Sequence, residues 1–332
     1  MRTVLEKNSL TQNVLILGAA GRFGAEACRA FDNAGWTVFA QARKGLAPSL
    51  LERVQFIHAD VLEYQTILEQ LQQRGVRIDL IAHALNPDYA RWDRLLPPIT
   101  EAVLALAKAT GATVMIPGNV YNFGRELPQQ LTEETPFIAN TAKAAQRIAM
   151  ERAFKSAADE GVRTIVIRAG DFIGGSGTWL DMAMAKSLHK GVFTSMGNPQ
   201  LAHAWAYLPD LARTFVMVAQ CREQLPCFEV LHYSGLTASQ SEILAAFESL
   251  MAQPLKVKPM PWTLMRILGW VSPLIGAVVA MRYLWQQPHQ LSGDKLRRLI
   301  GPLPQTSLHQ VLGEYLPDQL RPAIDDSSPK IA

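Results

Sequence analysis

Three glycines, Gly18, Gly21 and Gly24, follow a short apolar run and open a segment with helical periodicity. A tight turn from strand to helix needs a residue that tolerates a left-handed backbone, which Gly18 supplies. Gly21 lets the backbone approach a pyrophosphate, and Gly24 lets the helix pack against the strand, while the helix start offers free N–H donors. The spacing predicts a nucleotide-cofactor turn, although a glycine-rich turn without a ligand would look the same. The intervening residues of this predicted site are Ala20, Arg22 and Phe23.

Short apolar runs alternate with helix-length segments along much of the chain. Strands separated by helices imply right-handed crossovers, and therefore a parallel sheet with helices on both faces. We predict an α/β fold with a doubly wound parallel sheet of the Rossmann type. The predicted strands are NVLILG, WTVFAQAR, VQFIHAD, IDLIAHAL, ATVMIPG and RTIVIRAG, with FEVLHYSG as one more.

The alternation gives way to helical segments and Pro-rich turns later in the chain. We expect a cofactor-binding domain of residues 1–175, to which residues 201–235 return. Residues 176–200 and 236–325 are expected to form a smaller, mostly helical substrate domain, followed by a flexible tail, 326–332.

Composition excludes several classes of protein. Lys and Arg total 32 against 29 Asp and Glu, so a net charge of +3 provides no global field for nucleic acid. Three cysteines without CxxC spacing predict neither a disulfide framework nor a structural metal. The early apolar run is too short for a signal peptide, and we expect a cytoplasmic protein.

One apolar run, residues 267–281, has fifteen residues without a charge between Arg266 and Arg282. A membrane span needs roughly 20 such residues, and Pro273 would break a helix near the middle of the run. We therefore expect no membrane span and favour buried helices with a bend. A substrate or interface surface, and contact with a membrane, stay open.

The second predicted strand ends in Gln41-Ala42-Arg43-Lys44. NAD-specific folds usually place an acid here, on the ribose hydroxyls, whereas a guanidinium can hold a 2′-phosphate. We favour NADP(H) over NAD(H), which stays possible, with Arg43 as the ligand of the 2′-phosphate. The alternative is that Arg43 and Lys44 are solvated loop charges.

Several segments together resemble the extended and atypical short-chain dehydrogenase/reductases and the NAD-dependent epimerase/dehydratase group. They are the glycine turn, HADV at 58–61, NVY at 119–121, RAGDFIG at 168–174 and AYLPDLA at 206–212. The resemblance runs through most of the chain. It implies cofactor contacts by Asp60 and Val61 at the adenine, Ala82 and His83 beside the cofactor, and Ala169, Gly170 and Phe172 near the nicotinamide. Asp60 could instead cap a helix.

The chemistry of this family needs a Tyr, a Lys four residues later and an upstream Ser. Lys143 matches the lysine and is expected at the cofactor ribose, but Ala139 stands at the tyrosine position and Asn119 at the serine position. A methyl group cannot transfer a proton, so the usual reaction cannot be carried over intact. This departure resembles the atypical subgroup with a poorly kept tetrad.

Other groups could stand in for the absent tyrosine. Tyr121 follows the fifth strand and is our candidate acid, unless it only packs beneath the nicotinamide. Asn119 could hydrogen-bond a substrate carbonyl or could hold a turn. His83 fits a packed wall better than a catalyst, and Lys143 could be a solvated helix lysine.

The resemblance places several apolar and polar residues over the nicotinamide, although core packing would also explain each: Trp179, Met196, His203, Trp205 and Tyr207. We favour an NADP(H)-dependent oxidoreductase acting on a small, fairly apolar carbonyl or alcohol. A non-catalytic NADP(H) sensor and a nucleotide-sugar epimerase or dehydratase are the alternatives. The substrate is not identifiable, and a homodimer stays open.

Overall fold

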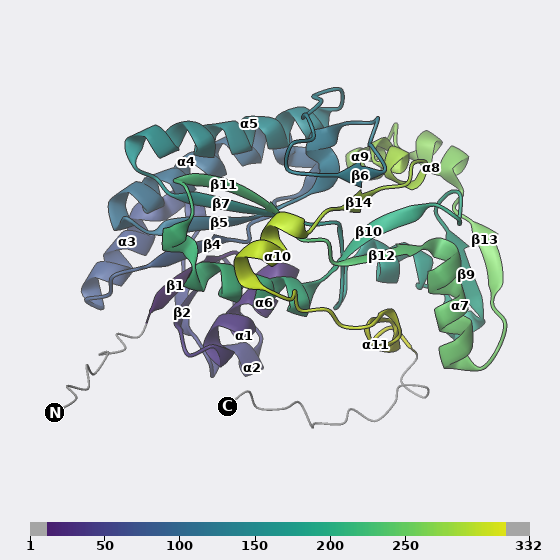
Figure 1. The fold of residues 1–332 in the computed structure, drawn as a ribbon, viewed down its shortest axis with the longest axis horizontal. Coiled ribbons are helices and arrows are strands. Elements are labelled where there is room, and N and C mark those ends of the chain that lie inside the picture. The colour runs from purple at the N-terminus through teal and green to yellow at the C-terminus, as the bar shows by residue number, and fades with distance from the viewer. Residues whose placement is uncertain (1–11, 317–332) are drawn as a thin grey trace.

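The computed structural model describes residues 12–316. Its centre is a seven-stranded sheet in which every neighbouring pair of strands is parallel (Figure 1). The predicted strands all fall within it, which confirms the doubly wound α/β fold. In spatial order the strands are β11 (Phe228–His232), β7 (Thr164–Arg168), β5 (Thr113–Gly118), β4 (Leu80–His83), β1 (Asn13–Leu17), β2 (Thr37–Ala42) and β3 (Gln55–His58).

Helices cover both faces of this sheet (Figure 1). One core cluster joins one face to α3 (Tyr64–Gln73), α4 (Trp92–Thr110) and α5 (Ala142–Ala157). A second cluster joins the other face to α1 (Arg22–Asn33) and α6 (Leu208–Gln220). Chain order reverses between β4 and β1, so the crevice for a ligand is expected at their carboxyl ends.

Short helices complete these layers. They are α2 (Pro48–Leu51), α10 (Asp294–Ile300) and the single-turn elements η1 (Val61–Glu63), η2 (Tyr89–Arg91), η3 (Val120–Phe123), η4 (Ala158–Glu160) and η7 (Arg222–Gln224). η2 and η3 follow β4 and β5, so they lie at the same edge of the sheet as the glycine turn after β1.

Most of the remaining elements surround a third core cluster that contains Phe193, Trp205 and Phe247, whereas β6 and β14 pack in the first cluster. The strands form three small sheets: β8 (Asp171–Ile173), β10 (Ala202–Tyr207) and β12 (Leu236–Ser239); β9 (Val192–Ser195) with β13 (Lys256–Pro259); and β6 (Gln130–Leu131) with β14 (Gln290–Leu291). The helices are η5 (Leu180–Met184), η6 (Leu188–Lys190), α7 (Gln240–Met251), α8 (Trp262–Leu268), α9 (Pro273–Ala280), η8 (Arg282–Trp285) and α11 (Leu308–Gly313). The proposed division into two domains stays a prediction, and its tail, 326–332, lies outside the described residues.

The apolar run forms two short helices, α8 and α9, and the second begins at Pro273, as the break at proline predicts. Our expectation that these helices are buried is wrong. Trp270 and Val271, between the helices, are 85% and 82% exposed, and no residue of α9 is fully buried. No helix in the described part of the chain is long and apolar enough to cross a membrane.

Candidate functional site

The glycine turn joins β1 to α1 at the carboxyl edge of the sheet. Gly18 has φ +81, where only glycine is unstrained, and its N–H donates to the carbonyl of Gln41 at 3.1 Å. A Cβ on Gly24 would overlap the carbonyl oxygen of Gly18. Gly21 is the N-cap of α1, and no described side chain caps this helix or adds an acid to its first turn. Its first N–H groups are therefore suited to a pyrophosphate.

The residues between these glycines have different surroundings. Ala20 is exposed. The guanidinium of Arg22 donates to the backbone carbonyl of Gly177, which follows β8. Phe23 is buried, with its ring centroid 4.7 Å from that of Phe215 on α6. A cofactor would therefore meet the backbone of Phe23, whose side chain holds α1 against α6.

Arg43 lies just beyond β2, with its side chain 75% exposed and its guanidinium 3.5 Å from the carboxylate of Asp60. Asp60 also accepts a hydrogen bond from the backbone N–H of Leu62 at 3.0 Å, so it caps η1. Val61 is buried beside it. Gln41 is buried and engaged, because its amide accepts from the N–H of Gly18 and donates to the carbonyl of Ala59. Arg43 is thus exposed and available to a phosphate at this strand end, as is Lys44 beside it.

The ends of β4 and β7 carry the next predicted contacts. Ala82 and Ala169 are fully buried in the sheet. His83 is also buried, 6.2 Å between ring centroids from Phe154 of α5, and burial lowers its pKa to about 3, with a further contribution from Arg147. His83 is therefore neutral, in the setting of a packed wall.

Gly170 and Phe172 connect β7 to the small sheet. A Cβ on Gly170 would overlap the carbonyl of Ala204 on β10, so glycine allows the two segments to touch. Phe172 is half-buried, and its ring centroid is 6.3 Å from that of Phe23. This contact brings the end of β7 next to the start of α1.

The three catalytic candidates are close to one another around two aromatic rings. The amide oxygen of Asn119 accepts a hydrogen bond from the N–H of Tyr121 at 3.0 Å, which shapes η3. The ring of Tyr121 is 6.1 Å from that of Tyr89 and 6.3 Å from that of Trp92. The ammonium of Lys143 lies 4.9 Å and 4.7 Å from the same two rings, and it donates to the backbone carbonyl of Tyr89. Tyr121 and Lys143 therefore flank one aromatic pair.

Burial controls the protonation of this group. It raises the pKa of Tyr121 well above its ordinary value, and the carboxylate of Asp171 raises it further. Burial likewise lowers the pKa of Lys143. The Tyr121 phenol is held in its protonated form, in which it can donate a proton or a hydrogen bond.

Sequence reasoning missed a row of charges on α5. Lys143, Arg147 and Glu151 repeat every four residues, so they share one helix face, and all three are buried. Glu151 pairs with the fully buried Arg168 at 2.8 Å, and Arg168 donates to the carbonyl of Asn119 at 2.6 Å. Charges buried in this way need partners. The pairing with Glu151 holds Arg168 in place, and the hydrogen bond from Arg168 to Asn119 fixes the turn after β5. Their four-residue spacing was the signal that could have revealed them.

A second polar group, Asp171 and His203, joins β8 to β10. The Nε2 of His203 lies 2.9 Å from the carboxylate of Asp171, and both side chains are almost fully buried. The imidazole stacks on Trp285, with centroids 4.3 Å apart and planes at 4°. Sequence reasoning placed His203 in a pocket but did not assign Asp171 as its partner.

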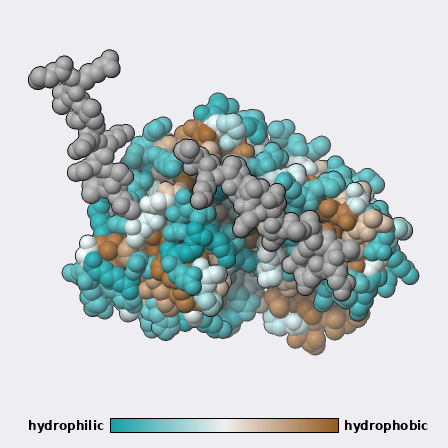
Figure 2. Space-filling model, turned by 90° about the horizontal axis from the view of Figure 1, so that it is seen from below, coloured by the Kyte–Doolittle hydropathy of each residue, from teal (hydrophilic) through white to brown (hydrophobic). Residues whose placement is uncertain are grey.

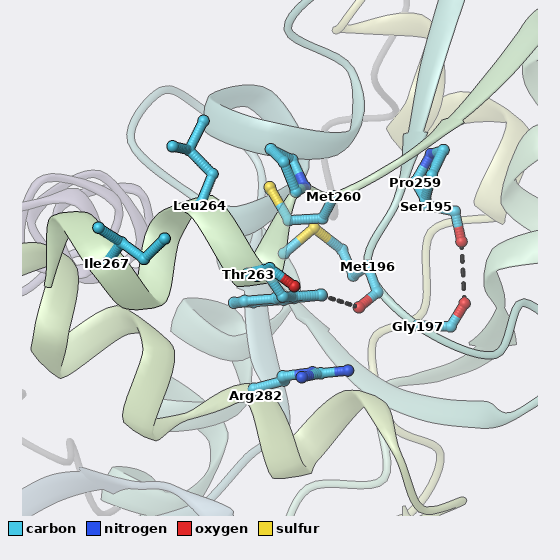
Figure 3. Close-up of a pocket in the computed structure, with 11 residues that line it drawn as sticks. Ser195, Met196, Gly197, Pro259, Met260, Thr263, Leu264, Ile267 and Arg282 are labelled. Carbon is cyan, nitrogen blue, oxygen red and sulfur yellow. Dashed lines mark hydrogen bonds between the residues drawn. The ribbon is translucent and has the colours of Figure 1, made fainter.

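The predicted pocket residues separate into three groups. Trp179, His203 and Trp205 gather around Trp285. Tyr207 donates to the carboxylate of Glu314. Met196 lines a different cavity of about 690 Å³, where its carbonyl accepts a hydrogen bond from the indole of Trp262 at 2.7 Å (Figure 3).

The fold and the glycine turn agree with a family-level match. Residues 14–231 match the model of the NAD dependent epimerase/dehydratase family. The chain therefore belongs to this family of nicotinamide-dinucleotide proteins. A comparison with curated protein sequences gives no significant match.

Solved structures with the same fold have low sequence identity to this chain. UDP-glucose-4-epimerase from Stenotrophomonas maltophila, with NAD and formylated UDP-arabinopyranose bound, is 16% identical with a TM-score of 0.72, over 90% of this chain and 95% of that one. L-threonine dehydrogenase from Clostridium difficile is 17% identical with a TM-score of 0.74, over 92% and 96%. UDP-glucose 4-epimerase from Brucella ovis, in complex with NAD, is 14% identical with a TM-score of 0.73, over 91% and 96%.

Proposed function

We propose that this chain is an NADP(H)-dependent oxidoreductase that interconverts a small, fairly apolar carbonyl compound and its alcohol. The observation that carries the proposal is the placement of Tyr121 and Lys143 around Tyr89 and Trp92, at the carboxyl edge of the sheet. Family chemistry requires a protonated phenol and an ammonium group. Here the phenol comes from the turn after β5, because the position four residues before Lys143 is Ala139, in the exposed loop ahead of α5.

The cofactor would be held by backbone and side chains from three strand ends. The glycine turn suits the pyrophosphate, and the exposed Arg43 suits a 2′-phosphate. The S. maltophila and B. ovis structures contain NAD, which supports a nicotinamide dinucleotide in this fold. Asp60 would border the adenine as well as cap η1, and Lys143 would meet the ribose.

The nicotinamide, when bound, supplies or accepts the hydride. Tyr121 donates its phenolic proton to the oxygen of the carbonyl as reduction proceeds. Asn119 holds the turn that positions Tyr121, and its N–H₂ group would orient the same oxygen. Buried aromatic side chains around Trp285 exclude water, which favours a fairly apolar substrate.

A non-catalytic NADP(H) sensor is the second candidate. It is favoured by Ala139, which has no proton to transfer, and by Lys143, whose ammonium donates to the carbonyl of Tyr89. A sensor would bind the cofactor by the same turn and change its contacts with a partner protein.

Turnover of NADPH separates the two candidates. We expect the purified chain to oxidise NADPH when a panel of aldehydes, ketones and quinones is added. Tyr121→Phe should keep cofactor affinity but reduce turnover by about 100-fold or more, because a positioned proton donor contributes about 10² to 10⁴. Tyr64→Phe, on α3, is the matched control and should turn over normally.

Ala139→Tyr restores the sequence spacing of the family, with a tyrosine four residues before Lys143 in the exposed loop that precedes α5, and tests the pocket itself. A gain of carbonyl reduction would show that substrates still reach the nicotinamide. The sensor would replace the proposed enzyme if the unmutated chain, Tyr121→Phe and Ala139→Tyr all bound NADPH and yet failed to oxidise it with any substrate of the panel.

A further inference from the structure

The helical hairpin of α8 and α9 carries an exposed apolar patch. Twelve large hydrophobic residues are exposed in the described part of the chain, and seven of them gather on this hairpin and the preceding strand, so they are not scattered singly. They are Val257, Leu264, Ile267, Leu268, Trp270, Val271 and Leu274, which we call the hairpin patch. The space-filling view from below shows hydrophobic residues gathered at its lower edge, right of centre (Figure 2).

Specific contacts hold the two helices of the hairpin together and attach α8 to the body of the protein. Gly269 at the end of α8 and Gly276 in the first turn of α9 let the two helices approach closely, since a Cβ on Gly269 would lie 3.1 Å from the Cα of Gly276. Trp262 anchors α8 to the body through the carbonyl of Met196, and Arg282 stacks over the same indole at 5.7 Å. Leu264 and Ile267 lie at one side of the cavity, away from Ser195 and Gly197 (Figure 3).

The charged residues of β13 and the hairpin, with Arg282 that follows α9, are all of one sign. Lys256, Lys258, Arg266 and Arg282 are exposed, and none has an acidic partner within salt-bridge distance among residues 12–316. The sequence from residue 249 to 293 contains no Asp or Glu. η2, which also packs against α9, has charges of both signs in and beside it: Asp88, Arg91, Asp93 and Arg94.

We infer that the hairpin patch docks onto the surface of an anionic lipid bilayer. Trp270 and Val271 would enter the boundary between headgroups and acyl chains, where tryptophan is favoured, and the four cations would contact anionic headgroups. The hairpin is too short to span the bilayer, so it lies at the surface.

The charge pattern favours a bilayer over a second copy of the chain. In a symmetric dimer through this patch, four unpaired cations would face four identical cations, which repel. An anionic surface neutralises all of them at once. The inference is independent of the proposed reaction, although α9 contacts η2, whose Tyr89 lines the candidate site, so docking would bring that site close to the lipid.

Vesicle sedimentation with the full-length chain tests this inference. We expect the chain to sediment with vesicles of phosphatidylcholine and phosphatidylglycerol, and to bind far more weakly to phosphatidylcholine alone or at high salt. Trp270→Ser with Val271→Ser should weaken binding about tenfold or more, because the buried apolar side chains are lost. Replacing Lys256, Lys258 and Arg266 by Gln should lower the affinity for the anionic vesicles about fivefold per residue.

Matched controls lie elsewhere on the surface. Leu51→Ser removes an exposed apolar residue of α2, and Arg152→Gln with Lys155→Gln removes two exposed cations of α5; neither should change vesicle binding. Circular dichroism checks that each variant is folded. The inference would be overturned if the variant with Trp270→Ser and Val271→Ser sedimented with anionic vesicles as well as the unmutated chain does. It would also be overturned if the unmutated chain did not bind these vesicles. A dimer that the same variant converts to monomer, without vesicle binding, would assign the patch to a second copy.

Discussion

At the scale of single residues, three side chains near the end of β2 have distinct tasks. Gln41 is buried and holds the glycine turn, and Asp60 caps η1, so neither is free to move far. Arg43 is mostly exposed, with a carboxylate 3.5 Å away as its partner. A phosphate could therefore replace or join that partner with little rearrangement of the backbone.

Arg43→Ala should narrow the preference for NADPH over NADH. We expect a loss of about 1 to 3 kcal/mol in that preference, the range for a hydrogen bond to a charged group. Fluorescence titration with both cofactors measures it. Arg53→Ala, which removes another surface arginine paired with an acid, is the control and should leave the preference unchanged. Equal affinities for the two cofactors in the unmutated chain would remove the NADP assignment.

At the scale of elements, the turn between β1 and α1 uses its glycines for two different purposes. Gly18 and Gly24 serve the backbone, because one has a positive φ and the other has no space for a Cβ. Gly21 has φ −78, an ordinary value, and a Cβ there would lie 3.1 Å from the carbonyl of Gly18. This contact is tight, but it needs only a small shift and the backbone conformation does not require glycine, so the approach of a ligand is a further reason for the missing side chain.

Substitution at these two glycines should separate folding from binding. Gly21→Val should abolish cofactor binding with little change in the melting temperature, because the branched side chain fills the space for a pyrophosphate. Gly24→Val should lower the free energy of unfolding by about 1 to 3 kcal/mol or more, since the helix must move from the strand. Thermal melts followed by circular dichroism, with cofactor titration, distinguish them. Undiminished binding by Gly21→Val would mean that this glycine serves only the turn.

At the scale of the whole molecule, histidines in different parts of the fold are buried without charge. His83 ends β4, His232 ends β11 and His289 precedes β14. Burial lowers the pKa of each to about 3. Because an unfolded histidine titrates near 6.5, the unfolded chain binds more protons than the folded chain between these two values.

The contribution of these histidines to the free energy of unfolding should therefore be fully present above about pH 6.5 and be lost progressively as the pH decreases below it. Each of these histidines contributes a loss of about 1 kcal/mol per pH unit below that point. Urea unfolding between pH 7.5 and 5 measures the slope, above the range where carboxylates titrate. His289→Phe should make the slope shallower, whereas His189→Gln, at an exposed site, should not. A slope that His289→Phe leaves unchanged would contradict this origin.

The local order of residues was enough to predict the parallel sheet, the glycine turn and the helix break at Pro273. These features depend on alternation, periodicity and backbone freedom within short windows. Tertiary structure alone paired Glu151 with Arg168 and Asp171 with His203, because residues 17 and 32 positions apart meet only after the sheet is assembled. It also decided that Trp270 is exposed. An apolar helix that packs inside a protein and one that faces outward have the same sequence pattern, and only the surrounding elements determine whether its side chains find a surface to cover them.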